Sequence, residues 1–124
     1  MVKPKQVGHL VLNVADVAAS TKFYTEILGF EIAVQRPDGS ATFLTCGEIH
    51  HDLALFQAPE DAAPARKGNI GLNHFAVQVE DFDALRDLYH TLLENDVPVD
   101  RTTDHSMTGS VYFCLLYTSP SPRD

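Results

Sequence analysis

The chain has 124 residues, of which 44% are hydrophobic and 21% are charged, a composition typical of one globular domain. Nine Lys and Arg against 17 Asp and Glu give a net charge of −8, which argues against nucleic acid or an anionic membrane surface as a partner. No apolar run is long enough to span a bilayer, no signal-peptide pattern is present, and Cys46 and Cys114 are too few for a disulfide framework. We therefore expect a cytoplasmic protein.

Residues 6–57 are expected to form a βαβββ module. The first strand, Val7–Val14, alternates between an apolar face that packs on helices and a second face that carries His9. Asp16 can cap the N-terminus of the helix that follows, and Gly29 can close its C-terminus. Three more strands are expected at Phe30–Arg36, Ala41–Cys46 and His51–Gln57.

Residues 58–69 are rich in Ala and Pro and are interpreted as a linker to a second module, residues 70–113. The first strand of this module begins at Ile70 and carries His74, and Asp81 caps the helix that follows. Two further strands are expected, at Val97–Thr102 and Ser110–Leu116. The polar loop between them contains His105.

Residues 9–36 and residues 74–101 repeat one sequence pattern at a shift of 65 residues. Because an internal repeat is a stronger fold signal than local propensity, it predicts two copies of one structural unit. We expect an α+β fold in which two tandem βαβββ modules form a half-open, barrel-like cleft. Eight aligned positions are identical: His9/His74, Val14/Val79, Asp16/Asp81, Ala19/Ala84, Tyr24/Tyr89, Leu28/Leu93, Val34/Val99 and Arg36/Arg101.

The last eleven residues, 114–124, do not supply the final strand that a second βαβββ module needs. Pro120 and Pro122 are incompatible with a central strand. The string also resembles the conceptual translation of a sequencing adapter. We therefore expect a single natural domain over residues 1–113, followed by a non-native tail that is loosely attached.

The repeat gives His9 and His74 equivalent positions on the first strand of each module. Both lie on the face opposite the helix-packing stripe, so the pseudo-twofold arrangement would bring them together at the bottom of a shared cleft. Imidazole is a common ligand of divalent metals, and two imidazoles leave room for a carboxylate and for open coordination sites. The plain alternative is that each is a histidine satisfied within the core.

Three more residues are candidates for chemistry, each with a plain structural alternative. His51 alternates with Leu53 and Leu55 and is a candidate acid/base or oxygen-stabilising donor, or else an exposed residue at a strand edge. His105 and Tyr112 could move protons to a bound phenol, or be a solvated loop histidine and a packed tyrosine. Two other residues are assigned no chemistry: His90 is expected on the surface, and Cys46 is expected to pack within a strand.

The paired modules with a histidine on each first strand resemble the vicinal oxygen chelate superfamily. This superfamily includes glyoxalase I, extradiol dioxygenases and bleomycin resistance proteins. Within it, the chain is most similar to catechol 2,3-dioxygenase-type enzymes, which cleave an aromatic diol with O2. The segments that carry this resemblance are Val7–Val14, His50–Leu55, Gly71–His74, Thr103–His105 and Ser110–Phe113.

The resemblance implies a site for Fe(II), or for Mn(II), bound by His9 and His74. It also implies that His51 is the acid/base residue beside the metal, and that His105 and Tyr112 hold and protonate the substrate oxygens. The implied partners are a small aromatic diol and O2, and a homodimer is possible. The third ligand in such enzymes is a Glu on the last strand, and no Glu follows Glu94 here. We therefore expect this chain to be inactive, or nearly so, as it stands.

Two alternatives belong to the same superfamily. A glyoxalase I-like isomerase needs a carboxylate on the last strand of the first module, where Leu55 cannot ligate. A metal-free binding protein of the bleomycin resistance kind need not keep both His9 and His74, so the histidine pair counts against it.

Overall fold

The computed structural model describes residues 1–66, 68–105 and 108–113. The chain divides into two compact units, Met1–Asp61 and Ala62–Asp124, and the division falls within the expected linker. Each unit contains one copy of the sequence repeat. The predicted α+β class is confirmed, because the first unit combines a helix with an open, mixed four-stranded sheet.

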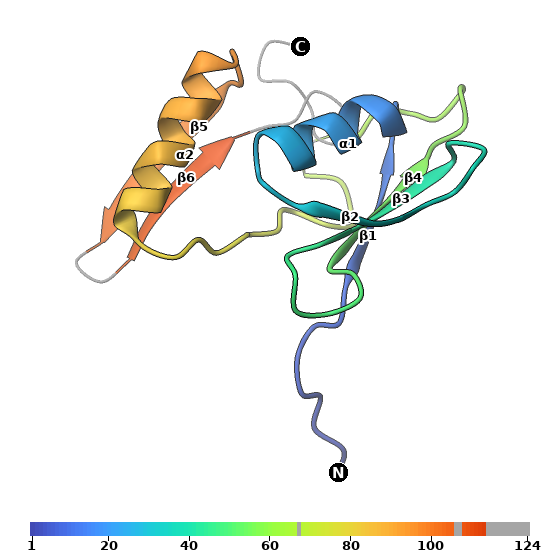
Figure 1. Ribbon diagram of the computed structural model, residues 1–124, viewed down its shortest axis with the longest axis horizontal. Coiled ribbons are helices and arrows are strands. Elements are labelled where there is room, and N and C mark those ends of the chain that lie inside the picture. The colour runs from blue at the N-terminus through green and yellow to red at the C-terminus, as the bar shows by residue number, and fades with distance from the viewer. Residues whose placement is uncertain (67, 106–107, 114–124) are drawn as a thin grey trace. The chain divides into compact units, whose positions relative to one another are not determined.

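The first unit has the βαβββ order that the sequence predicted (Figure 1). The sheet order is β1-β4-β3-β2, in which β1 and β4 are parallel and the other neighbours are antiparallel. The element bounds are β1 Leu10–Val14, α1 Val17–Glu26, β2 Glu31–Gln35, β3 Ala41–Thr45 and β4 Leu53–Gln57.

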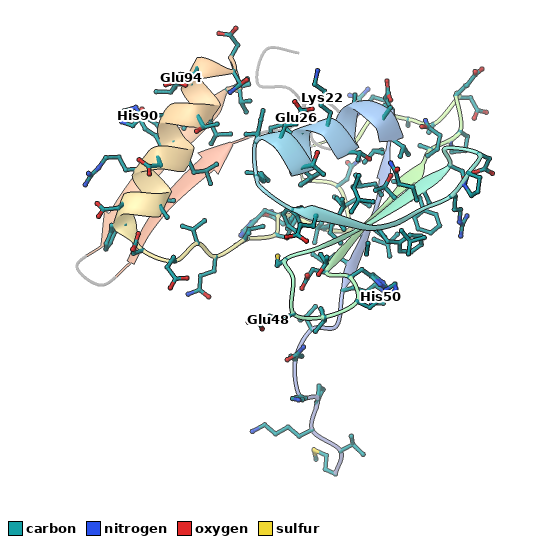
Figure 2. All side chains as sticks on the ribbon, in the orientation of Figure 1. Lys22, Glu26, Glu48, His50, His90 and Glu94 are labelled. Atoms are coloured by element: carbon teal, nitrogen blue, oxygen red, sulfur yellow. The ribbon has the colours of Figure 1, made fainter. Side chains whose placement is uncertain are left out.

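One face of this sheet packs on α1, as Figure 1 shows. A hydrogen bond of 2.9 Å joins the hydroxyls of Thr21 on α1 and Thr42 on β3, and both residues are buried. The Tyr24 ring meets the Phe30 ring edge-on, with centroids 5.8 Å apart. The outer side of α1 carries Lys22 and Glu26, which point away from the sheet (Figure 2). Buried apolar residues of this unit are Val14, Val17, Tyr24, Phe30, Ala41, Leu44, Leu53, Ala54 and Leu55.

The predicted helix ends in this unit are confirmed. The Asp16 carboxylate accepts a hydrogen bond of 3.0 Å from the backbone N–H of Ala19, which satisfies one of the free donors of the first turn. Past the helix, Gly29 adopts a φ of 79°, a left-handed conformation that glycine reaches without a steric penalty.

The other face of the sheet is more open. Strand alternation and register place Val11 of β1, Ala54 and Phe56 of β4, and Phe43 of β3 on this face, opposite α1. Val11 is 50% exposed, whereas Leu12, its neighbour on the α1 side, is only partly exposed. We refer to this surface of unit one as the open face.

The second unit contains α2 Phe82–Glu94, β5 Val99–His105 and β6 Thr108–Phe113. The two strands pair antiparallel, and α2 packs along this hairpin (Figure 1). Asp81 caps α2 as predicted, because its carboxylate accepts a hydrogen bond of 2.9 Å from Ala84 N–H. Leu92, on the inner side of α2, is fully buried.

Two expectations for the second unit are wrong. Residues 72–79, where a first strand was expected, form no strand. In unit one the equivalent strand, β1, pairs with β4, and the counterpart of β4 would follow Phe113, outside the described residues. The polar loop expected around His105 is instead the end of β5, where His105 lies in register with Thr108. Hairpin pairing with β6 extends β5 through this polar sequence, overriding its weak local strand preference.

The expected strand Ser110–Leu116 is confirmed as far as Phe113, and the tail 114–124 lies outside the described residues. Within the part of the chain that the structure describes, no helix is long and apolar enough to cross a membrane.

Candidate functional site

His9 and His51 lie together at one end of the open face. Their ring centroids are 4.6 Å apart, with the ring planes tilted by 49°. His9 is exposed and lies immediately before β1, which begins at Leu10 rather than at Val7 as expected. His51 is half-buried and lies before β4, which begins at Leu53. The two strands are parallel neighbours, so the segments that enter them also run side by side.

Asp52 fixes the position of His51. Its backbone joins both neighbouring strands: Asp52 N–H donates to Leu44 O at 2.8 Å, and Asp52 O accepts from Leu10 N–H at 3.0 Å. Its carboxylate accepts a hydrogen bond of 2.7 Å from Cys46 N–H, at the start of the β3–β4 loop. Three bonds from one residue therefore anchor the segment that presents the His51 ring.

The β3–β4 loop also carries His50, beside His51. Their Nδ1 atoms are 2.8 Å apart, a hydrogen bond in which one imidazole donates and the other accepts. Figure 2 shows His50 and Glu48 on this loop. The Thr45 hydroxyl closes the loop by donating to Ile49 O at 2.7 Å and accepting from Gly47 N–H at 2.8 Å. His50 therefore lies on a loop that is held by hydrogen bonds to the Thr45 side chain.

The grouping of His51 with Leu53 and Leu55 by strand alternation is wrong. Alternation grouped it with Leu53 and Leu55, but both leucines are buried on the α1 side of the sheet. The His51 ring instead contacts His9 and, edge-on at 5.2 Å between centroids, Phe43 on the open face. Residues 51 and 52 lie outside β4, so the alternation of that strand does not extend to them.

Aromatic rings continue from His51 along the open face. Phe43 meets Phe56 with centroids 5.9 Å apart, and the guanidinium carbon of Arg36 lies 5.0 Å from the centre of the Phe56 ring. Phe43, Phe56 and Arg36 were not among the predicted site residues. The alternation of β3 and β4 was a signal that could have grouped the two phenylalanines.

His74 belongs to the second unit and is exposed there. Its Nδ1 lies 2.6 Å from the Asn73 side-chain oxygen, at hydrogen-bond distance. A bond of this kind orients an imidazole for metal binding. The pairing of His74 with His9 stays a prediction, because the two residues lie in different units.

The other predicted residues are placed by the backbone. His105 is the last residue of β5, and Tyr112 of β6 lies in register with Arg101, at the other end of the hairpin. His90 is exposed on α2, as predicted (Figure 2). Within the described ranges, no three His, Cys, Asp or Glu side chains come together as a metal site.

Cys46 lies just past the end of β3 and is exposed, so the expectation that it packs within a strand is wrong. Partial burial of the sulfur, and then the Asp52 carboxylate beside it, raise the pKa of the Cys46 thiol above its ordinary value of 9.0. A raised pKa leaves little thiolate near neutral pH, so this cysteine is a poor nucleophile.

The family model of the Glyoxalase/Bleomycin resistance protein/Dioxygenase superfamily matches residues 6–122. The chain belongs to this superfamily. The chain is 30% identical to biphenyl-2,3-diol 1,2-dioxygenase 3 of Rhodococcus globerulus over 109 residues, which are 87% of this chain and 56% of that protein. Metallothiol transferase FosB of Staphylococcus haemolyticus is 30% identical over 114 residues, 90% of this chain and 77% of that protein.

The solved structures show the same fold. A glyoxalase/dioxygenase from Nostoc punctiforme superposes with a TM-score of 0.76 at 22% identity, covering 91% of this chain and 87% of that one. The predicted superfamily membership is therefore confirmed. The chain itself spans about half the length of the Rhodococcus dioxygenase.

Proposed function

We propose that the chain carries the fold and two of the metal ligands of a metal-dependent extradiol ring-cleaving dioxygenase acting on a catechol-type diol with O2, and that without a third ligand it is inactive, or nearly so, as it stands. The observation that carries this proposal is the contact between His9 and His51, whose ring centroids are 4.6 Å apart. The proposed reaction needs a proton-transfer group beside the metal, and His51 lies beside a proposed ligand. The relation to a biphenyl-diol dioxygenase adds support.

The proposed metal ligands are His9 and His74, with Fe(II) as the metal and Mn(II) as the alternative. Two neutral imidazoles suit either ion, and the contact between His74 Nδ1 and the Asn73 side-chain oxygen would orient the His74 ring. These histidines fit two positions of a two-histidine, one-carboxylate triad. When bound, the metal would hold diol and O2 at adjacent positions and let electron density pass between them.

In this proposal His51 moves a proton at the diol oxygen beside His9. Its Nδ1 is engaged with His50, so Nε2 is the ring atom through which it would act. The half-buried ring is held by His9 on one side and Phe43 on the other, which limits its motion. His105 and Tyr112 are proposed to hold and protonate the substrate oxygens.

The open face also bears on the glyoxalase I alternative. Leu55 was the position compared with the extra carboxylate of that enzyme, but Leu55 is fully buried on the α1 side. The residues that flank Leu55 on the open face are Ala54 and Phe56, and neither side chain can bind a metal, so β4 offers no carboxylate for the isomerase's metal.

The test is anaerobic loading with Fe(II), addition of catechol, and admission of air while the visible absorbance is followed. We would test the chain as it stands and a variant in which residues 114–124 are replaced by a Glu-bearing strand. The variant should form a yellow ring-cleavage product. His9→Ala and His74→Ala in that variant should abolish it, and His90→Ala, which removes an exposed histidine on α2, should not.

Three results would contradict the proposal. Iron binding by the Glu-bearing variant without cleavage of any catechol would remove the dioxygenase assignment. Turnover of methylglyoxal and glutathione with Ni(II) or Zn(II) would favour the isomerase. Tight, metal-independent binding of an aromatic ligand would favour a binding protein.

A further inference from the structure

A row of rings crosses the open face from the proposed metal ligand to a cation. The centroid distances are 4.6 Å from His9 to His51, 5.2 Å from His51 to Phe43, and 5.9 Å from Phe43 to Phe56. The Arg36 guanidinium ends the row, 5.0 Å from the Phe56 ring centre. We call these five side chains the ring row.

The ring row is longer than one aromatic ring. Phe43 joins His51 to Phe56, so the centres of the His51 and Phe56 rings lie no more than about 11 Å apart. A single-ring diol held at His9 and His51 would not cover the whole row. A second ring attached to the diol could lie on Phe43 and Phe56, which are half-buried and retain accessible ring surface.

Arg36 forms no close ion pair at the far end: among the side chains that the structure describes, no carboxylate lies within 4.0 Å of its guanidinium. The nearby Asp38 carboxylate accepts a hydrogen bond of 2.9 Å from Ser40 N–H. The Asp38 pKa is lowered mainly by hydrogen bonds from Ser40 and more weakly by the Arg36 charge, so Asp38 and Arg36 interact at longer range without pairing. Stacking on Phe56 orients the planar guanidinium, and a planar fork is suited to a carboxylate.

We propose that Arg36 selects two-ring aromatic diols that carry an anionic group on the distal ring. This inference rests on the proposed dioxygenase function and names its substrate class. The diol lies at His9 and His51, the second ring lies on Phe43 and Phe56, and a carboxylate at the distal end pairs with Arg36. The plain alternative is that Arg36 stacks on Phe56 as a surface contact and binds nothing.

The test compares three ligands by calorimetric titration of the Fe(II)-loaded chain, kept anaerobic: catechol, 3-phenylcatechol and 3-(4-carboxyphenyl)catechol. We expect the carboxylated diol to bind about fivefold more tightly than 3-phenylcatechol, the scale of a partly exposed ion pair. Higher salt should reduce this difference. Arg36→Gln should abolish it, and Arg36→Lys, which keeps the charge without the planar fork, should retain part of it.

Lys22→Gln is the matched control, because Lys22 is an exposed cation of the same unit on the outer side of α1 (Figure 2). It should leave the preference unchanged. Equal affinities of the unmodified chain for the two phenyl-substituted diols would overturn the Arg36 assignment and leave the dioxygenase proposal standing. An equal loss of preference in Lys22→Gln would also overturn it, since the effect would then be one of net charge. If none of the three diols binds, both proposals fail.

Discussion

The His51 ring lies between the His9 ring and the Phe43 ring, with centroid distances of 4.6 and 5.2 Å. Phe43 also contacts Phe56 on the side away from His51, so the imidazole is held by a continuous aromatic surface. A half-buried histidine in such a position has little rotational freedom. The contact therefore positions His51, the proposed proton-transfer group, beside a proposed metal ligand.

The first prediction separates proton transfer from metal binding. In the Glu-bearing variant, His51→Gln should reduce the rate of catechol cleavage by about 10²- to 10⁴-fold, the usual contribution of a general acid or base. Its Fe(II) affinity should stay within about threefold, because His51 is not a proposed ligand. Anaerobic iron titration and stopped-flow absorbance measure the two quantities. A large loss of iron affinity would show that His51 acts as a ligand.

Much of unit one could be predicted because its signals are local. Asp16 at the start of α1 and Gly29 after its end were assigned from residue type and spacing, and both perform the expected roles. Strand alternation gave the two faces of β1 correctly. The repeat then transferred the same assignment to Asp81 and α2.

The errors occur where long-range pairing decides the structure. The position of His51 depends on the bonds from Asp52 to Leu44 and Leu10, which join strands that are distant in sequence. Residues 72–79 alternate as a strand would, but they form no strand, because strand formation needs a pairing partner as well as an alternating pattern. The packing of Arg36 on Phe56 has no local signal in the sequence.

The second prediction concerns Asp52 as a positioning residue. Asp52→Ala removes the acceptor of the 2.7 Å bond from Cys46 N–H and should lower the free energy of unfolding by about 1–2 kcal/mol. The His51 ring should also lose its fixed contact with His9, which NMR contacts between the two rings would report. Asp52→Asn is the control, since its amide oxygen can still accept from Cys46. Ring contacts unchanged in Asp52→Ala would refute the positioning role.

The third prediction concerns the buried hydroxyl pair of Thr21 and Thr42. Thr42→Val keeps the shape but leaves the Thr21 hydroxyl without its 2.9 Å partner, at a cost of about 1–3 kcal/mol. Thr21→Val with Thr42→Val removes both polar groups, so the double variant should be more stable than Thr42→Val. Urea unfolding of the unchanged chain, the two single variants Thr21→Val and Thr42→Val, and the double variant gives the coupling free energy between the two hydroxyls. Additive single changes would mean that the hydrogen bond contributes nothing.

The fourth prediction uses the repeat. Asp16→Ala and Asp81→Ala each remove a carboxylate that accepts from an N–H of the first helical turn, at 3.0 and 2.9 Å. Each should destabilise its own helix by about 1 kcal/mol. Hydrogen exchange should show the loss in α1 for the first change and in α2 for the second. Asp16→Ser and Asp81→Ser, which restore a capping oxygen, should recover most of the protection. Equal effects of either alanine on both helices would contradict a local capping role.

The fifth prediction tests the charge environment at Cys46 by the rate of thiol alkylation. Partial burial raises the pKa of the Cys46 thiol most, followed by the Asp52 carboxylate and then, more weakly, by Glu48. Because the thiolate is the reacting form, a lower pKa increases the rate at any pH below it. At pH 8, Asp52→Asn should therefore accelerate reaction with iodoacetamide, Glu48→Gln should accelerate it less, and Glu60→Gln should not change it. The Asp52→Asn effect should vanish above the pKa, where the thiol is ionised in both proteins. Acceleration that persists there would mean that the substitution opens access to the sulfur and leaves its pKa unchanged.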